Sequence, residues 1–347
     1  MTLHLFNPEH DLALAANLSN FTAPHAGRQL RADLGFIPAL WAAEDDRVLV
    51  ESVEDAERRF LLLAHRPFHG FIEKEQIRKE PITGVSVWGW DPAICAFLKR
   101  QGVEERLMPN EEQMATIREL SSRRYAMMLL SQLREPGTVG EAVMVSTTAE
   151  VERQLDVYGH IVVKAPWSSS GRGVRFMAGT ISSNDAGWVR NVIDRQGAVM
   201  VEPYYHKVRD FGMEFESDGE GRVTYLGLSL FQTSGGAYTG NILAGEDEKQ
   251  EMISRYIPID LLNTIQEKIC AWTGALFEGK YQGPFGVDMM VVTRDDEEGF
   301  LLQPCVEINL RRTMGHVALS LTPFMEGLPK TMCVDYENNR YKICVKR

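Results

Sequence analysis

Two segments near the C-terminal end of the chain carry oxygen-bearing side chains whose spacing could hold a metal ion. Residues 283–292 and 300–310 read as strands, and the polar residues between them predict a β-hairpin. In the expected register Asp288 lies opposite Glu307, and strand alternation places Asn309 on the same face as Glu307. Two carboxylates and an amide suit Mg²⁺, or Mn²⁺, bridging to substrate phosphates better than they suit Zn²⁺.

The register of this hairpin rests on pairing Arg294 with Leu301 across the loop. Carboxylates directly opposite each other have Cβ atoms about 5 Å apart and repel, so a neighbouring positive charge must offset them. Pro304 is unfavourable in a central strand and predicts an edge or a bulge nearby. A shift of one residue would place Asp288 and Glu307 on opposite faces. A solvated outer face is the alternative to a metal site.

A lysine ends another strand-like segment, and a loop of small polar residues follows it. Lys164 shares a strand face with Val162, and burying an unpaired ammonium costs several kcal/mol, so Lys164 needs a counter-anion or a route to water. In the loop at residues 168–173, small side chains allow backbone N–H groups to converge on an anion, and Arg172 adds a positive charge. A lysine that reaches solvent, followed by a plain linker, is the alternative. Neither a Walker A sequence nor a dinucleotide fingerprint occurs here.

The composition is that of a globular protein and argues against several functional classes. The 347 residues carry a net charge of −11, with 37 basic and 48 acidic residues, which argues against DNA or RNA as a partner. The five cysteines lie far apart and form no CxxC pair, so we expect no zinc site, no disulfide framework and a cytoplasmic location. The N-terminus lacks the features of a signal peptide, and polar residues interrupt the longest uncharged span, residues 223–245, so we expect no membrane segment.

The pattern of apolar residues predicts three lobes. In residues 1–118, short apolar runs alternate with amphipathic stretches, which predicts a parallel α/β lobe. Residues 119–204 predict a small α+β lobe that includes a helix with a capping box at Thr147. Residues 205–347 predict a larger α+β lobe, with two hairpins and a glycine-rich turn at residues 234–240.

Four motifs in a fixed order give the chain a wider resemblance. The strand lysine with its Ser/Gly loop comes first, followed by MVEPYY, GVDMMV and EINLRRTMG. In this order and spacing the sequence resembles the ATP-grasp superfamily over roughly residues 110 to 320. The resemblance implies an α/β and α+β fold in which two α+β lobes clasp a nucleotide beside an N-terminal parallel lobe.

The resemblance also implies roles for individual residues. Lys164 matches a lysine that contacts the α- and β-phosphates of ATP, and Arg311 matches an arginine that steadies the reaction intermediate. Asp288, Glu307 and Asn309 match the ligands of Mg²⁺. The residues implied in nucleotide binding are Arg123 or Arg124, Lys164, Ser168, Ser169, Ser170, Gly171, Arg172 and Gly173, with Glu202, Pro203 and Tyr204 at the adenine and Asp210 at the ribose.

The chemistry implied by this resemblance is ATP-dependent ligation. ATP phosphorylates a small-molecule carboxylate, and an amine or peptide-like acceptor then attacks the acyl phosphate. A kinase that phosphorylates a hydroxyl and a nucleotide-binding module without turnover are the alternatives. Candidate contacts to the substrate are His10, Asp11, Trp90, Asp91, Arg312 and His316, each of which could instead be a cap, core or surface residue. Tyr238 is the candidate contact from a substrate loop in the glycine-rich segment.

Overall fold

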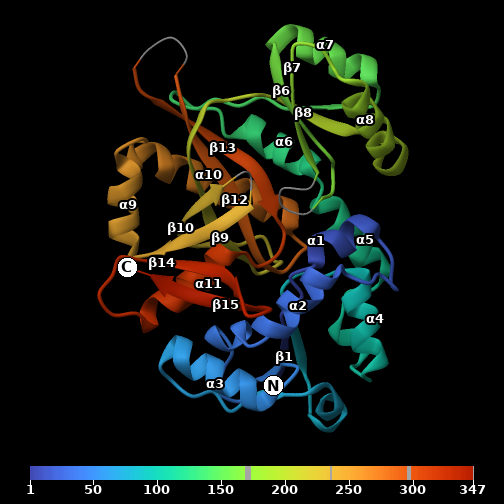
Figure 1. The fold of residues 1–347 in the computed structure, drawn as a ribbon, viewed down its shortest axis with the longest axis vertical. Helices are drawn as coiled ribbons and strands as arrows, with labels where there is room; N and C mark the ends of the chain where they lie inside the picture. The colour runs from blue at the N-terminus through green and yellow to red at the C-terminus, as the bar shows by residue number, and fades with distance from the viewer. Residues whose placement is uncertain (169–172, 235–236, 295–297, 347) are drawn as a thin grey trace. The chain divides into compact units, whose positions relative to one another are not determined.

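The computed structural model describes residues 1–168, 173–234, 237–294 and 298–346 (Figure 1). The chain forms two compact units, each assembled from segments that are distant in the sequence. The first unit contains Met1–Glu119, Thr239–Gly245 and Leu310–Arg347, and the second contains Leu120–Tyr238 and Glu246–Asn309. The division into three lobes, with boundaries after residues 118 and 204, stays a prediction.

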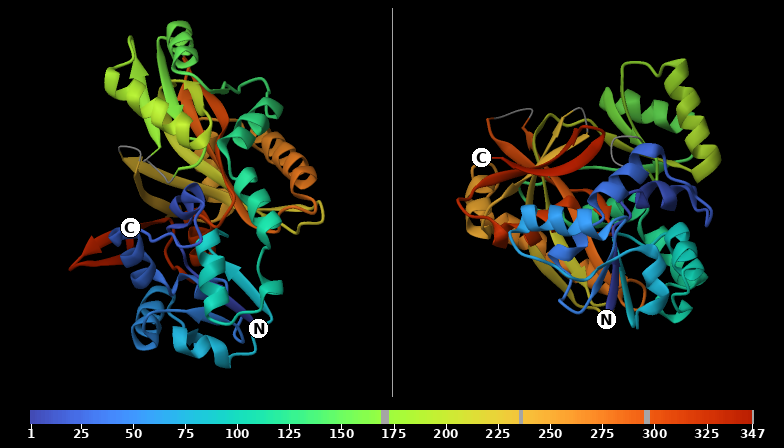
Figure 2. Two further views of the ribbon diagram at one scale, coloured as in Figure 1. Left: turned by 90° about the vertical axis from the view of Figure 1, so that its right-hand side faces the viewer. Right: turned by 60° about the horizontal axis from the view of Figure 1, so that its bottom comes forward.

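The first unit is built on a parallel four-stranded sheet, which confirms the expectation from the N-terminal sequence pattern. The strand order is β3-β2-β1-β4, with β1 (Thr2–Leu5), β2 (Arg47–Leu49), β3 (Phe71–Ile72) and β4 (Gly84–Val87). Helices cover both faces of this sheet (Figure 2). Leu3 of β1 packs with Leu98 on one face, and Val48 of β2 packs with Phe60 on the other. Parallel strands need this cover because both of their faces are apolar.

The remaining helices and strands of the first unit come from both ends of the chain. They are α1 (His10–Ala16), α2 (His25–Leu34), α3 (Val53–Ala64), α4 (Pro92–Arg100), α11 (Met314–Leu321), β14 (Lys330–Glu337) and β15 (Arg340–Lys346), with most of α5 (Glu111–Leu120) and of β11 (Ala237–Leu243). Short 3₁₀ helices lie at Ile37–Leu40, Lys74–Lys79, Glu105–Leu107 and Thr322–Phe324. The predicted C-terminal hairpin is confirmed, because β14 and β15 pair in antiparallel register from Thr331 to Lys346.

The predicted glycine-rich turn at residues 234–240 is wrong in its second half. Ala237–Leu243 forms strand β11, and its end pairs with β14. A Cβ atom at Gly240 would lie 2.6 Å from the carbonyl oxygen of Met332. Gly240 therefore permits a close approach between two backbones, which is a reason for glycine within a strand that local turn propensity does not reveal.

The second unit contains two groups of antiparallel strands. The first group has the order β5-β8-β6-β7, with β5 (Val143–Val145), β6 (His160–Lys164), β7 (Val174–Ala178) and β8 (Val199–Pro203), and it packs on α7 (Thr148–Tyr158) and α8 (Ser183–Gln196). The second group has the order β13-β12-β9-β10, with β9 (Lys207–Ser217), β10 (Val223–Ser234), β12 (Gly283–Thr293) and β13 (Phe300–Asn309). The helices α6 (Arg123–Gln132), α9 (Glu246–Ser254) and α10 (Ile259–Phe277) complete this unit. The capping box predicted at Thr147 is confirmed at the start of α7.

The β12–β13 hairpin confirms one predicted pairing and corrects another. Asp288 pairs with Glu307, as expected, but Leu301 pairs with Val292 and not with Arg294. The register shifts between Asp288 and Met290, where the facing residues of β13 include Pro304. The proline lacks the N–H donor that a regular ladder needs, so the bulge falls where the sequence predicted a disruption.

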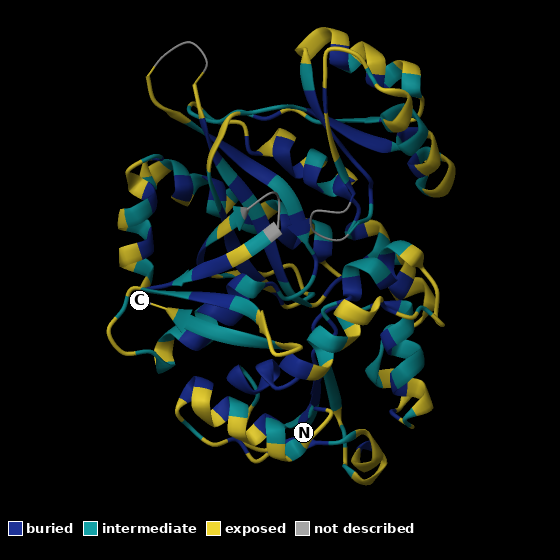
Figure 3. Ribbon diagram, in the orientation of Figure 1, coloured by how far each residue is buried: buried dark blue, intermediate teal, exposed yellow. Residues whose placement is uncertain are grey.

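Buried and exposed residues lie on opposite sides of several helices. Helices α3, α7 and α8 each bury one side and expose the other (Figure 3). In the part of the chain that the structure describes, no helix combines the length and the apolar character needed to cross a bilayer. The uncharged span that begins at Val223 starts with strand β10.

Candidate active site

The β12–β13 hairpin brings the three predicted metal ligands together. Asp288 lies directly opposite Glu307, and Asn309 lies opposite Gly286. The Asn309 side chain donates a hydrogen bond from Nδ2 to Oδ2 of Asp288 at 3.0 Å. Within the described ranges, no group of three or more His, Cys, Asp or Glu side chains is placed to hold a metal ion. The predicted set is not such a group, because its third member, Asn309, is an amide. The oxygens of Asp288, Glu307 and Asn309 are the donors that a hard divalent cation prefers.

Arg123 offsets the charge of the facing carboxylates. Its Nη2 atom donates to Oε1 of Glu307 at 2.7 Å, and its Nη1 atom donates to the carbonyl oxygen of Ala165 at 2.6 Å and to Oγ of Ser168 at 2.7 Å. The Arg123 side chain is only 4% exposed, whereas Arg124 is exposed at the surface of the same helix. Of the two arginines considered from the sequence, Arg123 is therefore the one that joins the hairpin to the start of the Ser/Gly loop.

Lys164 has its counter-anion within the protein. Its Nζ atom lies 2.7 Å from Oε1 and 2.8 Å from Oε2 of Glu202, and both side chains are buried. Glu202 pairs with Val162 across β6 and β8, so Lys164 is the diagonal neighbour of Glu202 on the same face. This geometry replaces the alternative in which the lysine reaches solvent. Strand β8 ends at Pro203, directly after the glutamate.

The Ser/Gly loop is closed at its base by backbone contacts. The amide of Ala165 donates to the carbonyl of Gly173 at 2.8 Å, and a Cβ atom on Gly173 would lie 2.2 Å from Cβ of Ser168. The Gln196 side chain pins the backbone of Trp167 through both its amide group (3.0 Å) and its carbonyl group (2.9 Å). Sequence reasoning missed Gln196, because it lies at the end of a helix and belongs to no local motif. The predicted loop residues Ser169, Ser170, Gly171 and Arg172 lie outside the described residues.

Aromatic and polar side chains surround the segment that follows Glu202. Tyr204 stacks on His160, with ring centroids 3.9 Å apart and an interplanar angle of 12°. The carboxylate of Asp210 accepts hydrogen bonds from Lys207 and from Oγ1 of Thr233. The sequence analysis singled out Tyr204 and Asp210 but missed their partners, because these come from the start of β6, the start of β9 and the far end of β10.

Cys305 is buried, and the charged side chains of this region affect the pKa of its thiol. Burial raises the pKa of Cys305 well above its usual value, and the negative charge of Glu202 acts in the same direction. Lys164 opposes this shift, and the carboxylates of Asp288 and Glu307 add to it. Both the lysine–glutamate pair and the hairpin carboxylates therefore influence this one buried thiol.

Arg311, the predicted catalytic arginine, belongs to the first unit. Its guanidinium forms a two-pronged contact with Asp11, with Nε to Oδ1 at 2.7 Å and Nη2 to Oδ2 at 2.8 Å. Bidentate arginine–carboxylate pairs fix the plane of the guanidinium as well as its position. Asp11, a candidate substrate contact in the sequence analysis, therefore holds Arg311 in this structure.

His10 and Asp91 lie in a buried polar network at the carboxyl ends of β1 and β4. Oδ1 of Asp91 caps α4 by accepting the amides of Ala93 and Ile94, each at 2.9 Å. Oδ2 of Asp91 accepts a hydrogen bond from Nδ2 of Asn7 at 3.0 Å and lies 3.6 Å from Nδ1 of His10. Asp91 is thus a helix cap, which was one of the roles considered for it. The network depends on Asn7, which sequence reasoning missed.

A cavity of about 180 Å³ opens beside this network in the first unit. Its polar lining residues are Asn7, Glu9, Thr22, Arg28, Arg31, Asp91 and Arg100. It lies outside the carboxyl ends of β1 and β4, where the strand order reverses, and α/β proteins commonly bind ligands at such a point. Burial raises the pKa of Glu9, although Arg31 contacts its Oε1 atom at 2.6 Å and opposes the shift.

The other candidate substrate contacts lie in a cation–π contact, in a helix cap or at half-buried positions. The Arg312 guanidinium lies over the Trp41 ring, 4.4 Å from its centroid, and the ring nitrogen Nδ1 of His316 accepts the amide of Thr313 to cap α11. Tyr238 is half-buried in β11. Trp90 is half-buried and packs against the core that contains Leu3 and Leu98.

Comparison with known proteins gives a fold but no close relative. No protein-family model matches the sequence, and no curated protein matches it. Among solved structures, biotin carboxylase from Campylobacter jejuni matches with a TM-score of 0.53 and 12% identity, covering 98% of this chain and 77% of the other. The biotin carboxylase domain of 2-oxoglutarate carboxylase from Hydrogenobacter thermophilus matches with a TM-score of 0.51 and 12% identity, covering 97% and 75%.

N5-carboxyaminoimidazole synthetase from Staphylococcus aureus, solved with ADP, matches with a TM-score of 0.50 and 13% identity. The match covers 97% of this chain and 83% of the other. At these identities the likeness concerns the fold alone. Together with the parallel N-terminal sheet and the two groups of antiparallel strands, it shows that the chain has the ATP-grasp fold.

Proposed function

We propose that this protein is a Mg²⁺- and ATP-dependent ligase that activates a carboxylate as an acyl phosphate for attack by an amine or a similar nucleophile. The observation that carries the proposal is the convergence of Lys164, Arg123 and the Asp288–Glu307 pair within one unit. Among the structures of similar fold, the biotin carboxylase was solved as a β,γ-ATP complex and the 2-oxoglutarate carboxylase domain with MgADP, ADP and bicarbonate. The N5-carboxyaminoimidazole synthetase was solved with ADP. These ligands support a nucleotide as the ligand of this protein.

The proposed nucleotide site uses positive charge. Lys164 and Arg123 supply cationic groups for the phosphates, and Gln196 holds the backbone at the base of the Ser/Gly loop in place. The residues that would hold the metal ion are Asp288, Glu307 and Asn309, and their oxygen donors fit Mg²⁺. Bound Mg²⁺ supplies charge neutralisation at the phosphates during transfer.

The proposed carboxylate and acceptor sites are in the first unit. The arginines that line the cavity beside Asn7 fit the carboxylate of a small molecule, and Glu9 offers an acceptor for an amine. Asp11 orients Arg311, whose guanidinium can stabilise the negative charge of the tetrahedral intermediate. In the reaction, a carboxylate oxygen attacks the terminal phosphorus of ATP and releases ADP. The amine nitrogen then attacks the acyl carbon, loses a proton and displaces phosphate.

Nucleotide binding can be tested before the acceptor is known. We expect the purified protein to bind a fluorescent ADP analogue in a Mg²⁺-dependent manner, and Glu307→Gln to weaken that binding at least about tenfold, because it removes one ligand charge. Glu216→Gln makes the same chemical change at an exposed position of β9 and should bind like the wild type. Absence of Mg²⁺-dependent binding by the wild type, or equal binding by Glu307→Gln, would contradict the site.

The reaction itself is tested by its products. The protein is screened with ATP, Mg²⁺ and pairs of carboxylates, including bicarbonate, and amines, and the release of ADP and phosphate is measured. Ligation gives ADP, free phosphate and a new amide or carbamate. A stable phosphate ester would instead identify a kinase, and nucleotide binding without turnover across the panel would favour a binding module.

A further inference from the structure

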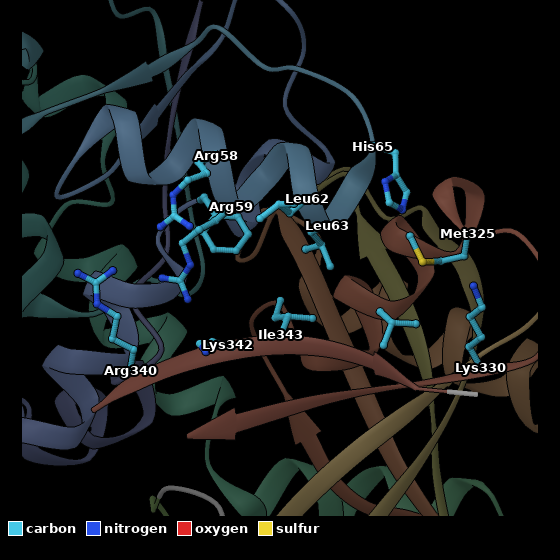
Figure 4. Close-up of a pocket in the computed structure, with 12 residues that line it drawn as sticks. Arg58, Arg59, Leu62, Leu63, His65, Met325, Lys330, Arg340, Lys342 and Ile343 are labelled. Carbon is cyan, nitrogen blue, oxygen red and sulfur yellow. The ribbon is translucent and has the colours of Figure 1, made fainter. Parts of the chain in front are cut away.

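A second groove lies in the first unit, between α3 and β15, and the proposed ligase chemistry does not use it (Figure 4). It has a cavity volume of about 560 Å³, which is within the range of small-molecule sites. The side chains that line it come from α3, from the hairpin β14–β15 and from the segments next to them. They are Phe36, Arg58, Arg59, Leu62, Leu63, His65, Met325, Lys330, Arg340, Lys342, Ile343 and Val345.

The middle of the groove is apolar. Leu63 and Ile343 face each other across it, and Leu62 lies beside them on the rim of α3 (Figure 4). The Leu62 side chain is 68% exposed, although the same helix buries Phe60 and Leu63 in the core. A large exposed leucine beside a hollow gives the groove a hydrophobic wall that the fold itself does not need, because the core side of α3 is already filled.

Cationic side chains surround this apolar centre. Arg58, Arg59, Arg340 and Lys342 gather at one end, and Lys330 and His65 lie toward the other (Figure 4). No acidic side chain is among the described residues that line the groove. This concentration of positive charge does not follow from composition, because the whole chain carries a net charge of −11.

The nearby carboxylates neutralise this charge only in part. Asp55 is shared by three guanidinium groups: it contacts Arg58, lies 3.8 Å from Arg59 and 3.2 Å from Arg340. Arg59 is committed to the fold, because it also donates to the carbonyl oxygens of Asp33 and Tyr341. The exposed guanidinium groups of Arg58 and Arg340 share Asp55 through its two different oxygens, and Lys342 lies 3.4 Å from Glu337. The cationic side chains of the groove still outnumber these carboxylates, so the groove can accept an additional anion.

We propose that this groove binds a small organic anion with a hydrophobic body. The anionic group is held by Arg58, Arg340 and Lys342, and the apolar body lies against Leu62 and the side chains opposite it. Guanidinium groups favour carboxylates and similar flat anions because they can donate two parallel hydrogen bonds. The proposal goes beyond the ligase function and does not depend on it.

The test uses octanoate as the probe, measured by isothermal titration calorimetry on the full-length protein. We expect one equivalent of octanoate to bind, and 1-octanol, which lacks the charge, and acetate, which lacks the chain, each to bind at least about tenfold more weakly. Equal binding of octanol would reduce the groove to a hydrophobic patch and overturn the proposal. Failure of the wild type to bind octanoate would overturn it as well.

Matched variants locate the bound anion. Leu62→Glu should weaken octanoate binding at least about tenfold, because it places a negative charge on the apolar wall. As the control, Val157→Glu also replaces an exposed apolar side chain with glutamate, at a 71% exposed position in α7, and should have no effect. The double variant Arg58→Gln/Arg340→Gln should also lose binding, with Arg153→Gln on α7 as the control. Wild-type affinity in both groove variants would place the octanoate elsewhere and refute the assignment. Binding of the fluorescent ADP analogue should be unchanged in all of them.

Discussion

The buried ion pair between Lys164 and Glu202 predicts a large loss of stability when one partner is removed. Lys164 and Glu202 are only 7% and 4% exposed, and the ammonium contacts both carboxylate oxygens, at 2.7 and 2.8 Å. Glu202→Gln keeps the shape of the side chain but leaves a buried ammonium without its counter-charge. Removing one member of a buried pair costs about 3–5 kcal/mol, and we expect about 3 kcal/mol here because the glutamine oxygen can still accept a hydrogen bond.

The assay is urea denaturation combined with hydrogen exchange. A loss of about 3 kcal/mol would lower the urea midpoint by about 1.5 M if the slope is about 2 kcal/mol per molar. Because the chain has two units, hydrogen exchange of the amides in β6 and β8 supplies the local free energy of opening that a global transition can hide. The same logic applies to Lys164→Ala, which leaves a buried carboxylate, so its activity must be compared at a temperature where the variant is folded.

A double variant and a surface control make the result decisive. Lys164→Met combined with Glu202→Leu replaces the pair with apolar side chains and should recover most of the lost stability. Glu337→Gln removes an exposed carboxylate that lies 3.4 Å from Lys342 and should cost less than about 1 kcal/mol. If Glu202→Gln costs no more than this control, the burial argument for Lys164 is refuted.

Three further predictions follow from local geometry. Gly173→Ala should weaken nucleotide binding at least about tenfold, because the added Cβ atom would lie 2.2 Å from Cβ of Ser168. Gly187→Ala is the control and should bind normally, because the nearest side-chain atom to its added Cβ atom, on Arg190, is 4.0 Å away. Titration of the fluorescent ADP analogue compares the two variants. Arg123→Met should lower the free energy of unfolding by about 2–3 kcal/mol, because it removes charged hydrogen bonds but leaves Glu307 partly exposed to water, and should abolish ADP release; denaturation and product analysis measure the two effects. Burial lowers the pKa of His4, so at a pH near 6.5 the folded state binds fewer protons than the unfolded state. The free energy of unfolding should therefore fall as the pH drops from 7.5 through 6.5 to 5.5. His4→Gln should flatten this pH dependence in urea titrations.

The sequence predicted those parts of the fold that depend on local patterns. Alternating apolar runs predicted the parallel N-terminal sheet, and a cap signature predicted the start of α7 at Thr147. The register of the β12–β13 hairpin shows the limit of such reasoning. The pairing of Asp288 with Glu307 is confirmed, but the pairing near the loop is shifted, because the bulge at Pro304 changes the count between the two ends. The second half of the turn predicted at residues 234–240 is wrong, because residues from Ala237 onward form a strand whose end pairs with β14, which overrides the local preference of glycine.

The sequence by itself determined which chemical groups are available and which of them share a strand face. It identified Lys164, Asp288, Glu307 and Asn309 because strand periodicity and hairpin register are local properties of the chain. Glu202 was implied only by the resemblance of the motifs to the ATP-grasp superfamily. Only the tertiary structure decided their partners. It showed that Lys164 binds Glu202, that Arg123 rather than Arg124 reaches Glu307, and that Asp11 holds Arg311 across 300 residues of sequence. The physical reason is that a buried charge takes the nearest opposite charge in space, and no pattern along the chain records that distance.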